Sequence, residues 1–455
     1  MALSAVRTNR ARVTATAIMV AIALAVRAVF FKYQTGDYAT FYGWYEFIKQ
    51  HGGFGALQYN FSNYNEPYLY LLALVTYLPV PALAGIKLIS VSFDLLLAFF
   101  TFKVVRQRYP QGWAPLAASS LVLFLPTVVL NSSWWGQVDA TYTAFALGGI
   151  YFVLRRKGWW ACALFGLALA FKLQAVFMFP FVLLLAFRHR LRWRELLAIP
   201  AVFVVADMPA LVLGAPISSL WSAYTGQVSQ YPQLTLNAPN IYQYFDVATS
   251  STLRLAGIAG ALAAVVVLGA LVVVRRVDLT PAHIVLAATV SVIVVPFLLP
   301  AMHERYFYMA DILTVVSAFY LPRKLWALPV LEQFASLFSY MPFLLATTTT
   351  AQAKPFPGIQ PAGTALGGAP LRGSSGAGRS TFSGGGGPNG FFGLPDHTIV
   401  SFPVLSSVML AALLLALWAA ASSMRRNKMS SQLVHSPQAR HSLAPIGRSQ
   451  YADNH

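Results

Sequence analysis

Cysteine and acidic residues are scarce in this sequence. Its single cysteine, Cys162, has no partner for an intramolecular disulfide and cannot build a site of several thiolates. Only 10% of the 455 residues are charged, against about 25% in an average soluble domain. The chain also has neither a P-loop nor the His/Cys spacing of a metal site, which argues against ATP-driven chemistry. These absences exclude the disulfide-rich, zinc-finger and P-loop classes.

Apolar sequence, by contrast, is abundant. Hydrophobic residues make up 57% of the chain, and runs long enough to cross about 30 Å of hydrocarbon alternate with short polar stretches from residue 13 to residue 420. The net charge of +18 falls largely in clusters between these runs, which is typical of cytoplasmic loops and not of nucleic-acid binding. We therefore predict an all-α polytopic transmembrane bundle of about 11–13 helices.

The basic clusters predict the orientation of the chain. A basic N-terminus places the first helix, residues 13–31, with its start in the cytoplasm, so that residues 32–66, 215–250, 300–306 and 346–400 lie outside. Between this terminus and the cluster at 155–157 the sequence has five apolar runs, where an even number of crossings is needed. One of the runs 67–81, 84–104 and 114–130 is therefore expected not to cross fully, and the sequence does not say which.

Four parts of the chain follow from this organisation. Residues 1–345 form the membrane module, whose outer loop 32–66 contains a short helix with apolar residues at Phe41, Tyr45 and Ile48. Residues 346–400 are Gly/Pro/Ser-rich and are predicted to be a flexible outer loop. Residues 401–423 form the last transmembrane helix, and residues 424–455 a disordered basic tail that favours anionic lipid.

Polar residues in so apolar a chain mark candidate chemistry, because burying them is costly. Asp37 follows the first helix within an aromatic stretch, and Glu66 precedes Pro67 at the start of the next helix. An aromatic belt with an incidental acid, and ordinary capping of a helix start, are the alternative explanations of these two acids.

Two later stretches carry denser polar groups. S-W-W-G-Q-V-D contains Gln137 and Asp139, where Asp139 is either a site residue or a simple cap of the following helix. M-H-E-R-Y contains His303, Glu304 and Arg305, which offer donors to a phosphate unless the loop is merely hydrophilic.

Charges inside apolar runs allow a rival interpretation. Lys172 interrupts the apolar stretch F-K-L-Q-A. Lys87 and Asp94 are seven residues apart and share one helical face, so they are either a structural pair or part of a binding site. Intramembrane charges of this kind are used by secondary transporters and lipid flippases, although no internal repeat relates two halves of the chain.

These residues carry a resemblance to a known family. The chain resembles the polytopic GT-C glycosyltransferases over about residues 13 to 325. The resemblance rests on the acid at Asp37 and on the stretches Y-N-E-P-Y-L-Y, S-W-W-G-Q-V-D, F-G-L-A-L-A-F-K-L-Q-A, L-N-A-P-N-I-Y and L-P-A-M-H-E-R-Y. The resemblance is closer to bacterial relatives of the second GPI-anchor mannosyltransferase. Beyond residue 325 nothing matches, and the Gly-rich loop departs from the family pattern.

The resemblance implies a hexosyltransferase, mannose favoured, that uses a polyprenyl- or dolichyl-phosphate sugar on the outer face of a membrane. Asp37 then acts as the base for an inverting transfer, with Asp139 in support. The implied substrate-binding residues are Glu66, Gln137, Lys172, His303, Glu304 and Arg305.

The partners implied are the lipid-linked donor, a glycan or lipid acceptor and membrane lipids, with no nucleic acid. The expected location is the bacterial cytoplasmic membrane. No cofactor is required, but Asp37, Glu66 and Asp139 leave open whether a divalent metal binds through oxygen ligands.

Overall fold

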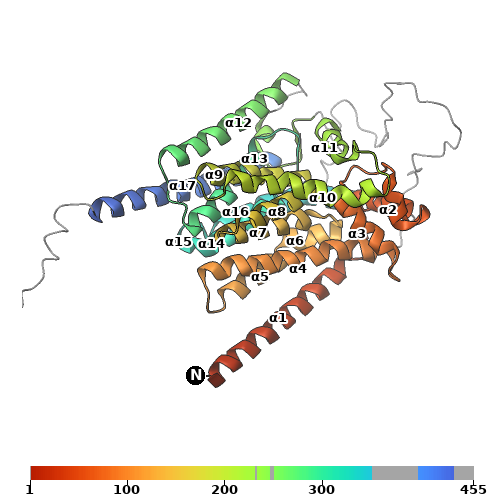
Figure 1. The fold of residues 1–455 in the computed structure, drawn as a ribbon, viewed down its shortest axis with the longest axis horizontal. Helices are drawn as coiled ribbons and strands as arrows, with labels where there is room; N and C mark the ends of the chain where they lie inside the picture. The colour runs from red at the N-terminus through yellow and green to blue at the C-terminus, as the bar shows by residue number, and fades with distance from the viewer. Residues whose placement is uncertain (1, 231–232, 246–250, 351–397, 435–455) are drawn as a thin grey trace, which may run out of the picture.

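Helices dominate the computed structural model, which describes the whole chain except residues 1, 231–232, 246–250, 351–397 and 435–455 (Figure 1). Most of the loop predicted at 346–400 lies outside the described residues. The helices pack into one bundle around a shared apolar core, as the sequence predicted. An all-α polytopic bundle is therefore confirmed.

The first half of the chain forms the side of the bundle that carries α1. Short 3₁₀ or π segments, labelled η, interrupt the α-helices. In order, the elements are α1 (Ala2–Phe30), β1 (Tyr33–Gln34), α2 (Gly36–Gln50), η1 (Gly53–Gln58), α3 (Glu66–Thr76), α4 (Ala82–Arg108), α5 (Ala114–Phe124), α6 (Pro126–Val129), η2 (Leu130–Trp135), α7 (Asp139–Leu154) and α8 (Gly158–Phe171).

The second half completes the bundle. Its elements are η3 (Leu173–Met178), α9 (Phe179–Phe187), η4 (Trp193–Leu197), α10 (Ala198–Val212), α11 (Ser219–Gln230), β2 (Thr235–Leu236), η5 (Ile241–Tyr244), α12 (Ser251–Val274), α13 (Pro281–Leu298), β3 (Met302–His303), α14 (Tyr308–Tyr320), α15 (Pro322–Leu325), α16 (Leu328–Thr347), β4 (Thr349–Thr350) and α17 (Phe402–Val434). β1 pairs with β4 in antiparallel fashion, and β2 with β3 in parallel.

Seven helices of the described chain are long and apolar enough to cross a membrane. The seven candidates lie in α1, α4, α10 together with η4, α12, α13, α16 and α17. The α5 helix and the α6–η2 segment form an eighth candidate if they are counted as one span that is bent by 53°. Three further apolar helices, including α8 and α14, are shorter. Some of the predicted crossings therefore correspond to apolar helices of only 13 to 15 residues.

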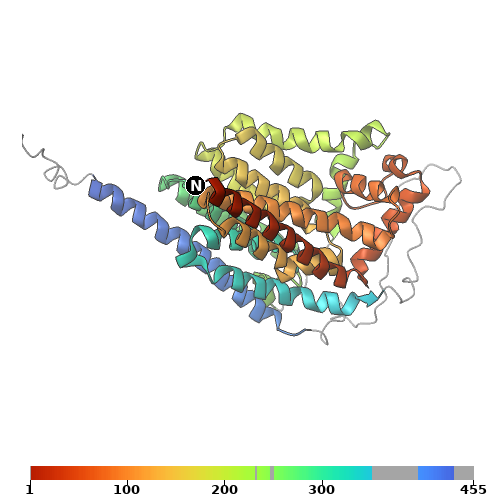
Figure 2. The ribbon, with the colours of Figure 1, turned by 90° about the horizontal axis from the view of Figure 1, so that it is seen from below.

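Of the three apolar runs 67–81, 84–104 and 114–130, the first forms the short helix α3. This helix has 11 residues and a length of about 16 Å, too short for about 30 Å of hydrocarbon. It packs beside α2 and η1 at one end of the bundle (Figures 1 and 2). Of the remaining runs, α1, α4 and the bent α5–η2 segment are candidate spans, whereas α7, with 16 residues, is not among them.

The predicted helix of the first outer loop is α2. Thr35 caps it by accepting a hydrogen bond from the Tyr38 backbone N–H at 3.3 Å. The three apolar positions predicted to share a face, Phe41, Tyr45 and Ile48, are all buried. Because this face packs on η1, α3 and α4, the helix forms a folded cover for that end of the bundle.

Buried charges attach α1 to the rest of the bundle. Arg27 of α1 forms an ion pair with Asp94 of α4 at 2.8 Å and also donates to the Leu123 carbonyl at 2.9 Å. The Lys87 ammonium donates to the carbonyls of Phe30, the last residue of α1, and of Phe31, which follows it, both at 3.2 Å. Lys87 and Asp94 are therefore not a pair with each other, and each holds α1.

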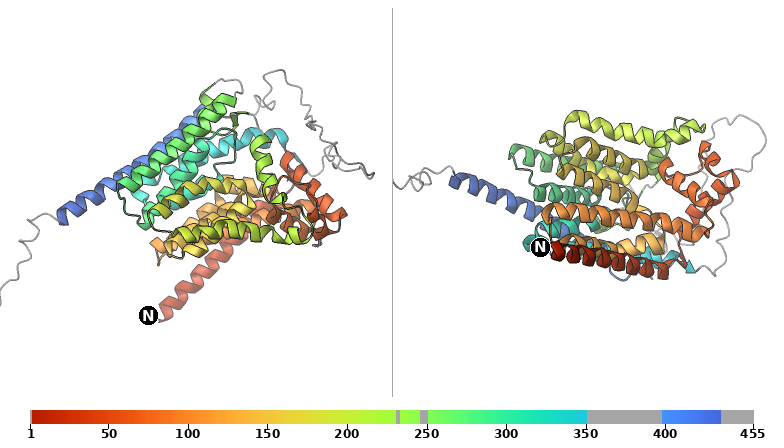
Figure 3. Two further views of the ribbon diagram at one scale, coloured as in Figure 1. Left: turned by 45° about the horizontal axis from the view of Figure 1, so that its top comes forward. Right: turned by 60° about the horizontal axis from the view of Figure 1, so that its bottom comes forward.

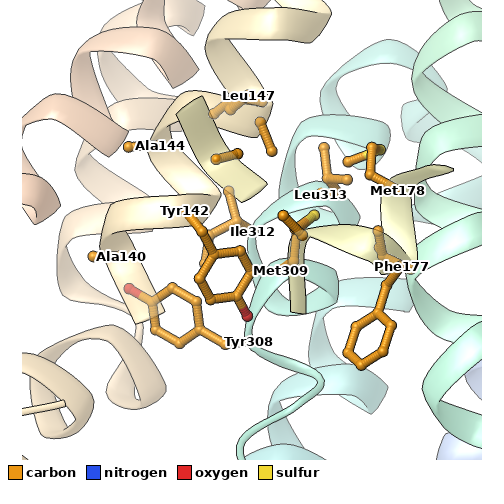
Figure 4. Close-up of a cluster of buried hydrophobic side chains, with 14 of the residues drawn as sticks. Ala140, Tyr142, Ala144, Leu147, Phe177, Met178, Tyr308, Met309, Ile312 and Leu313 are labelled. Carbon is orange, nitrogen blue, oxygen red and sulfur yellow. The ribbon is translucent and has the colours of Figure 1, made fainter. Parts of the chain in front are cut away.

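The centre of the bundle is an apolar cluster shared by α7, η3 and α14 (Figure 4). Tyr142, Leu147, Phe177 and Ile312 are representative members, with at most 4% of each residue exposed.

The predicted disordered tail does not begin at residue 424. Instead, helix α17 continues past that residue to Val434. The rest of that tail lies outside the described residues.

Candidate active site

The S-W-W-G-Q-V-D stretch is folded so that alternate side chains face one region. Residues 130–135 form the π-helical turn η2, which ends at Gly136 with φ +77°. That left-handed conformation favours glycine, and it turns the chain sharply into the first turn of α7 at Asp139. The backbone of Trp135 also accepts a hydrogen bond from the Thr35 hydroxyl at 3.0 Å, which ties this turn to the start of α2.

Asp37 lies in the first turn of α2, opposite this turn. Its Oδ2 accepts a hydrogen bond from the Trp135 indole N–H at 2.8 Å and another from the Gln137 amide. Its Oδ1 accepts none from any residue in the described part of the chain, and 29% of the side chain is exposed. One oxygen of the carboxylate is therefore fixed, and the other is available to a ligand.

Asp139 differs from Asp37 because its surroundings satisfy both of its oxygens. Lys172 pairs with Oδ1 at 2.5 Å, and the Asn131 amide donates to Oδ2 at 2.8 Å. Asp139 is completely buried and 5% of the Lys172 side chain is exposed. A carboxylate so enclosed is suited to fixing Lys172 and not to accepting a proton from a substrate.

Gln137 and Tyr64 join these two carboxylates into one network. The Gln137 side chain donates to Asp37, while its Oε1 lies 3.3 Å from the Tyr64 hydroxyl and 3.5 Å from the Lys172 ammonium. The ammonium also lies over the Tyr64 ring, 5.6 Å from its centroid. Lys172 takes this position because α8 ends there, with extended backbone before η3 begins.

The H-E-R stretch reaches the same place from the other half of the chain. His303 ends β3, and the pairing of β3 with β2 places L-N-A-P-N-I-Y, residues 236–242, alongside it. The Leu236 carbonyl accepts from the Glu304 N–H at 3.1 Å, and Ser339 of α16 donates to the Glu304 carbonyl at 3.2 Å. The L-N-A-P-N-I-Y stretch therefore braces the loop that carries the charged side chains.

Arg305 approaches Asp37 from this loop. Its Nη1 is 3.7 Å from Asp37 Oδ2 and 3.1 Å from Glu304 Oε1, and the guanidinium lies over the Trp135 ring, 5.4 Å from its centroid. Its buried Nε has no hydrogen-bond partner, and Nη2 donates to no described residue. The Nε–Nη2 edge, which is the edge that binds an oxyanion in bidentate fashion, is thus unused.

Charge balance keeps this loop ionised. Burial raises the pKa of Glu304, but the hydrogen bond from His303 and the charge of Arg305 outweigh burial, so the pKa lies below its usual value. Burial lowers the pKa of Arg305, but the carboxylates of Asp37 and Glu304 hold it well above its usual value. The loop therefore presents a permanent cation beside the half-free carboxylate.

Seven of the eight residues singled out from the sequence gather in this network. They are Asp37, Gln137, Asp139, Lys172, His303, Glu304 and Arg305. Glu66 lies apart, beside Asp207 of α10, where Asn65 donates to Asp207 at 2.9 Å. The sequence interpretation missed Tyr64 and Asn131 as members of the network. All that pointed to them was their position, Tyr64 in N-Y-N-E-P and Asn131 in N-S-S-W-W-G-Q.

A three-carboxylate metal site is not formed. Among the described residues no three His, Cys, Asp or Glu side chains are grouped as metal ligands would be, and Glu66 is not part of the Asp37 network. The oxygens of Asp139 already have protein partners. Asp37, Glu66 and Asp139 therefore do not form the oxygen cage that the sequence left open.

Comparison with known families places this network in a context. A family model described as glycosyltransferase family 87 matches residues 61–300, more than half of the chain. The chain belongs to glycosyltransferase family 87. The matched segment of this family 87 chain contains Tyr64, the W-G-Q-V-D turn and Lys172, while Asp37 and Arg305 lie just outside it. A search of curated proteins finds no match.

Family membership establishes the general activity. The protein is a multi-pass membrane glycosyltransferase of GT-C type, which uses a sugar donor and an acceptor. The transporter or flippase alternative loses its basis, because Lys87 and Asp94 hold α1 and Lys172 belongs to the network at the end of the bundle. The narrower likeness to relatives of the GPI-anchor mannosyltransferase stays a prediction.

Proposed function

We propose that this glycosyltransferase moves one hexose, with mannose favoured, from a polyprenyl-phosphate donor to a glycan or lipid acceptor on the outer face of the membrane. The observation that carries the proposal is the pairing of Asp37, which has one free oxygen, with Arg305, which has one unused edge. Transfer from a lipid phosphate requires a base for the acceptor hydroxyl and an anion-binding group for the leaving phosphate within one site.

The reaction follows from this pairing. Asp37 Oδ1 accepts the proton of the acceptor hydroxyl as the hydroxyl oxygen forms a bond to the anomeric carbon. The bond from that carbon to the phosphate oxygen breaks on the opposite side, and its electron pair leaves with the polyprenyl phosphate. One bond forms and one breaks with inversion at the anomeric carbon, and no oxidant or nucleotide takes part.

The leaving phosphate is the partner proposed for Arg305. The unused Nε–Nη2 edge matches two phosphate oxygens, and the guanidinium is already oriented by Glu304 and by the Trp135 ring. His303 lies on the same loop and is 12% exposed, so it is placed to share the phosphate. Because these donors are fixed before the reaction, little energy is spent on arranging them during it.

The remaining members of the network serve as positioning residues in this proposal. Gln137 holds the fixed oxygen of Asp37, and Asp139 holds Lys172, whose ammonium reaches Gln137. Asp139 thus supports the base indirectly. Glu66 lies outside the network, beside Asp207 where α3 packs on α10, and its role in substrate binding stays a prediction.

Three helices support the outward orientation. α7 begins at Asp139 and ends beside the basic cluster at residues 155–157, while α14 begins beside Arg305 and ends before Arg323. α1 runs the other way, from the basic N-terminal segment to the Asp37 loop. The network and the basic residues thus lie at opposite ends of the bundle, so the positive-inside rule directs the network outward.

Donor preference tests the proposal. The full-length protein in liposomes is supplied with a membrane lipid extract and one of three radiolabelled donors: polyprenyl-phosphate mannose, polyprenyl-phosphate glucose or a nucleotide-linked mannose. We expect label to move from the lipid-linked mannose and not from the nucleotide sugar. Transfer from glucose alone corrects the sugar and keeps the donor class. Transfer only from the nucleotide sugar refutes the lipid-phosphate donor, because Arg305 would then serve another group.

A further inference from the structure

A groove lies at the opposite end of α1 from the Asp37 network. α1 meets the bundle near its C-terminal end, where Arg27 and Lys87 hold it, and diverges from α5 toward its N-terminus (Figures 1 and 3). Between α1, α4 and α5 the divergence leaves a cavity of about 760 Å³. Its volume is in the range of pockets that hold organic ligands.

The walls of the groove are apolar along most of their length. Val20 and Leu24 of α1, Phe102 of α4 and Leu116 of α5 line it, together with the small Ala17 and Ala21. All three helices are candidates to cross the membrane or belong to such a candidate. The groove therefore faces hydrocarbon, and a small water-soluble ion has no reason to occupy its apolar part.

Two arginines are placed where the apolar walls end. Arg12 of α1 and Arg106, in the last turn of α4, both line the groove. Neither forms an ion pair with any acidic residue of the described chain. Arg12 lies over the Trp113 ring, 6.0 Å from its centroid, and its buried Nε has no hydrogen-bond partner.

The basic end of the bundle favours cations in general, and this preference explains part of the placement of Arg12 and Arg106. Arg106 favours the C-terminus of α4, and the positive-inside rule accounts for basic residues near the cytoplasm. Neither effect explains why two arginines line one groove or why the Arg12 Nε–H is buried without an acceptor. Leaving such a donor unsatisfied is unfavourable, which favours an anionic acceptor beside Arg12.

The dimensions of the groove match one leaflet. From Arg12 to Leu24 the helix rises about 18 Å, and half of a hydrocarbon core of about 30 Å is about 15 Å. A phospholipid with its phosphate at the two arginines would extend its acyl chains as far as the end of the groove. This match favours a lipid over a free phosphate as the occupant.

We propose that the groove between α1, α4 and α5 binds one anionic phospholipid of the leaflet at the basic end of the bundle, with its phosphate held by Arg12 and Arg106. This site is independent of the proposed transfer reaction, which takes place at the other end of α1. Basic pockets between transmembrane helices bind anionic head groups through the same combination of charge and apolar wall.

Lipid retention by the full-length protein tests the site. The protein in detergent is mixed with dioleoyl phosphatidylglycerol or dioleoyl phosphatidylcholine, and bound lipids are counted by native mass spectrometry. We expect one tightly held phosphatidylglycerol. Replacing both arginines, Arg12→Gln with Arg106→Gln, should weaken its binding about 30-fold, at roughly 1 kcal/mol for each basic side chain.

Two further variants separate shape from charge. Ala17→Trp fills the groove without changing any charge, and it should also release the lipid, because Ala17 is an exposed lining residue. Arg155→Gln with Arg323→Gln removes two exposed arginines that do not line the groove and should leave retention unchanged. A melting temperature for each variant shows that the fold is kept.

Several outcomes overturn the proposal. If phosphatidylglycerol and phosphatidylcholine are retained equally, the two arginines do not select an anionic lipid. If the Arg12/Arg106 and Arg155/Arg323 double variants lose phosphatidylglycerol equally, general surface charge accounts for binding. Competition by excess glycerol phosphate shows a site for a soluble anion and not for a lipid. A dimer that forms in place of lipid binding and is lost in Ala17→Trp shows that a second copy of the chain covers the groove.

Discussion

The buried pair of Asp139 and Lys172 leads to a prediction that separates positioning from catalysis. The two groups are 2.5 Å apart, with side-chain exposures of 0% and 5%. At an effective dielectric constant of about 20 their gross attraction is about 7 kcal/mol. Desolvation offsets most of it, so removing one partner should lower the unfolding free energy by about 3–5 kcal/mol through the unpaired charge that remains.

A double-mutant cycle measures this coupling. Asp139→Asn and Lys172→Met should each be strongly destabilising, whereas the double variant should recover at least about 2 kcal/mol of the summed loss. The unfolding free energies come from titration with sodium dodecyl sulfate in mixed micelles. Losses that simply add would refute the pairing. Because Asp139 is assigned no proton transfer, the double variant should also keep measurable transfer activity. Complete inactivity of this folded variant, with activity kept in folded Lys172→Met, would make Asp139 the base.

Three further predictions concern other parts of the molecule. Arg305→Lys should lower kcat/KM for transfer about 10- to 100-fold in steady-state assays, because an ammonium cannot form the bidentate contact, and an unchanged value would remove the phosphate from Arg305. Glu66→Gln should raise the melting temperature at pH 8 and leave it unchanged near pH 4. Burial and the charge of Asp207 raise the pKa of Glu66 from 4.5 to about 7, so ionisation costs the folded state up to about 3 kcal/mol, a cost that grows between these pH values. A pH-independent difference would contradict this. Arg27→Met should destabilise by about 3 kcal/mol, and adding Asp94→Asn should restore most of the loss in the same unfolding titration; no recovery would contradict the ion pair.

Much of the candidate site was visible in the sequence because polar residues are conspicuous in an apolar chain. Asp37, the W-G-Q-V-D stretch and H-E-R were selected on that basis, and the structure brings them within contact distance. Their meeting depends on helix starts and ends that the sequence also marks, such as Gly136 with its positive φ. Composition and run length were enough to predict the helical bundle.

Partner choice across the bundle was not predictable from spacing. Lys87 and Asp94 are seven residues apart on one face of α4, which fits a mutual contact, yet each has a partner on or near α1. A helical period says which residues share a face and not which helix will cover that face. Glu66 illustrates the same limit, since its neighbour Asp207 is 141 positions away.

Supporting residues were missed for a different reason. Tyr64 and Asn131 are ordinary residue types in a chain that contains 21 tyrosines, and only their contacts with Gln137 and Asp139 distinguish them. The L-N-A-P-N-I-Y stretch appeared only as part of a resemblance. Its position beside His303, where Leu236 belongs to strand β2, needed the fold. Network members without charge carry little signal in one sequence.

The central claim, that Asp37 is the base, is tested most directly by the transfer rate of Asp37→Asn. The matched control is Glu46→Gln, which removes a carboxylate from the same helix α2 outside the network. With lipid-linked mannose as donor, we expect Asp37→Asn to lower kcat at least about 100-fold while its melting temperature stays near that of the wild type, and Glu46→Gln to keep kcat within a few-fold. A folded Asp37→Asn enzyme that is as active as the control would contradict the account.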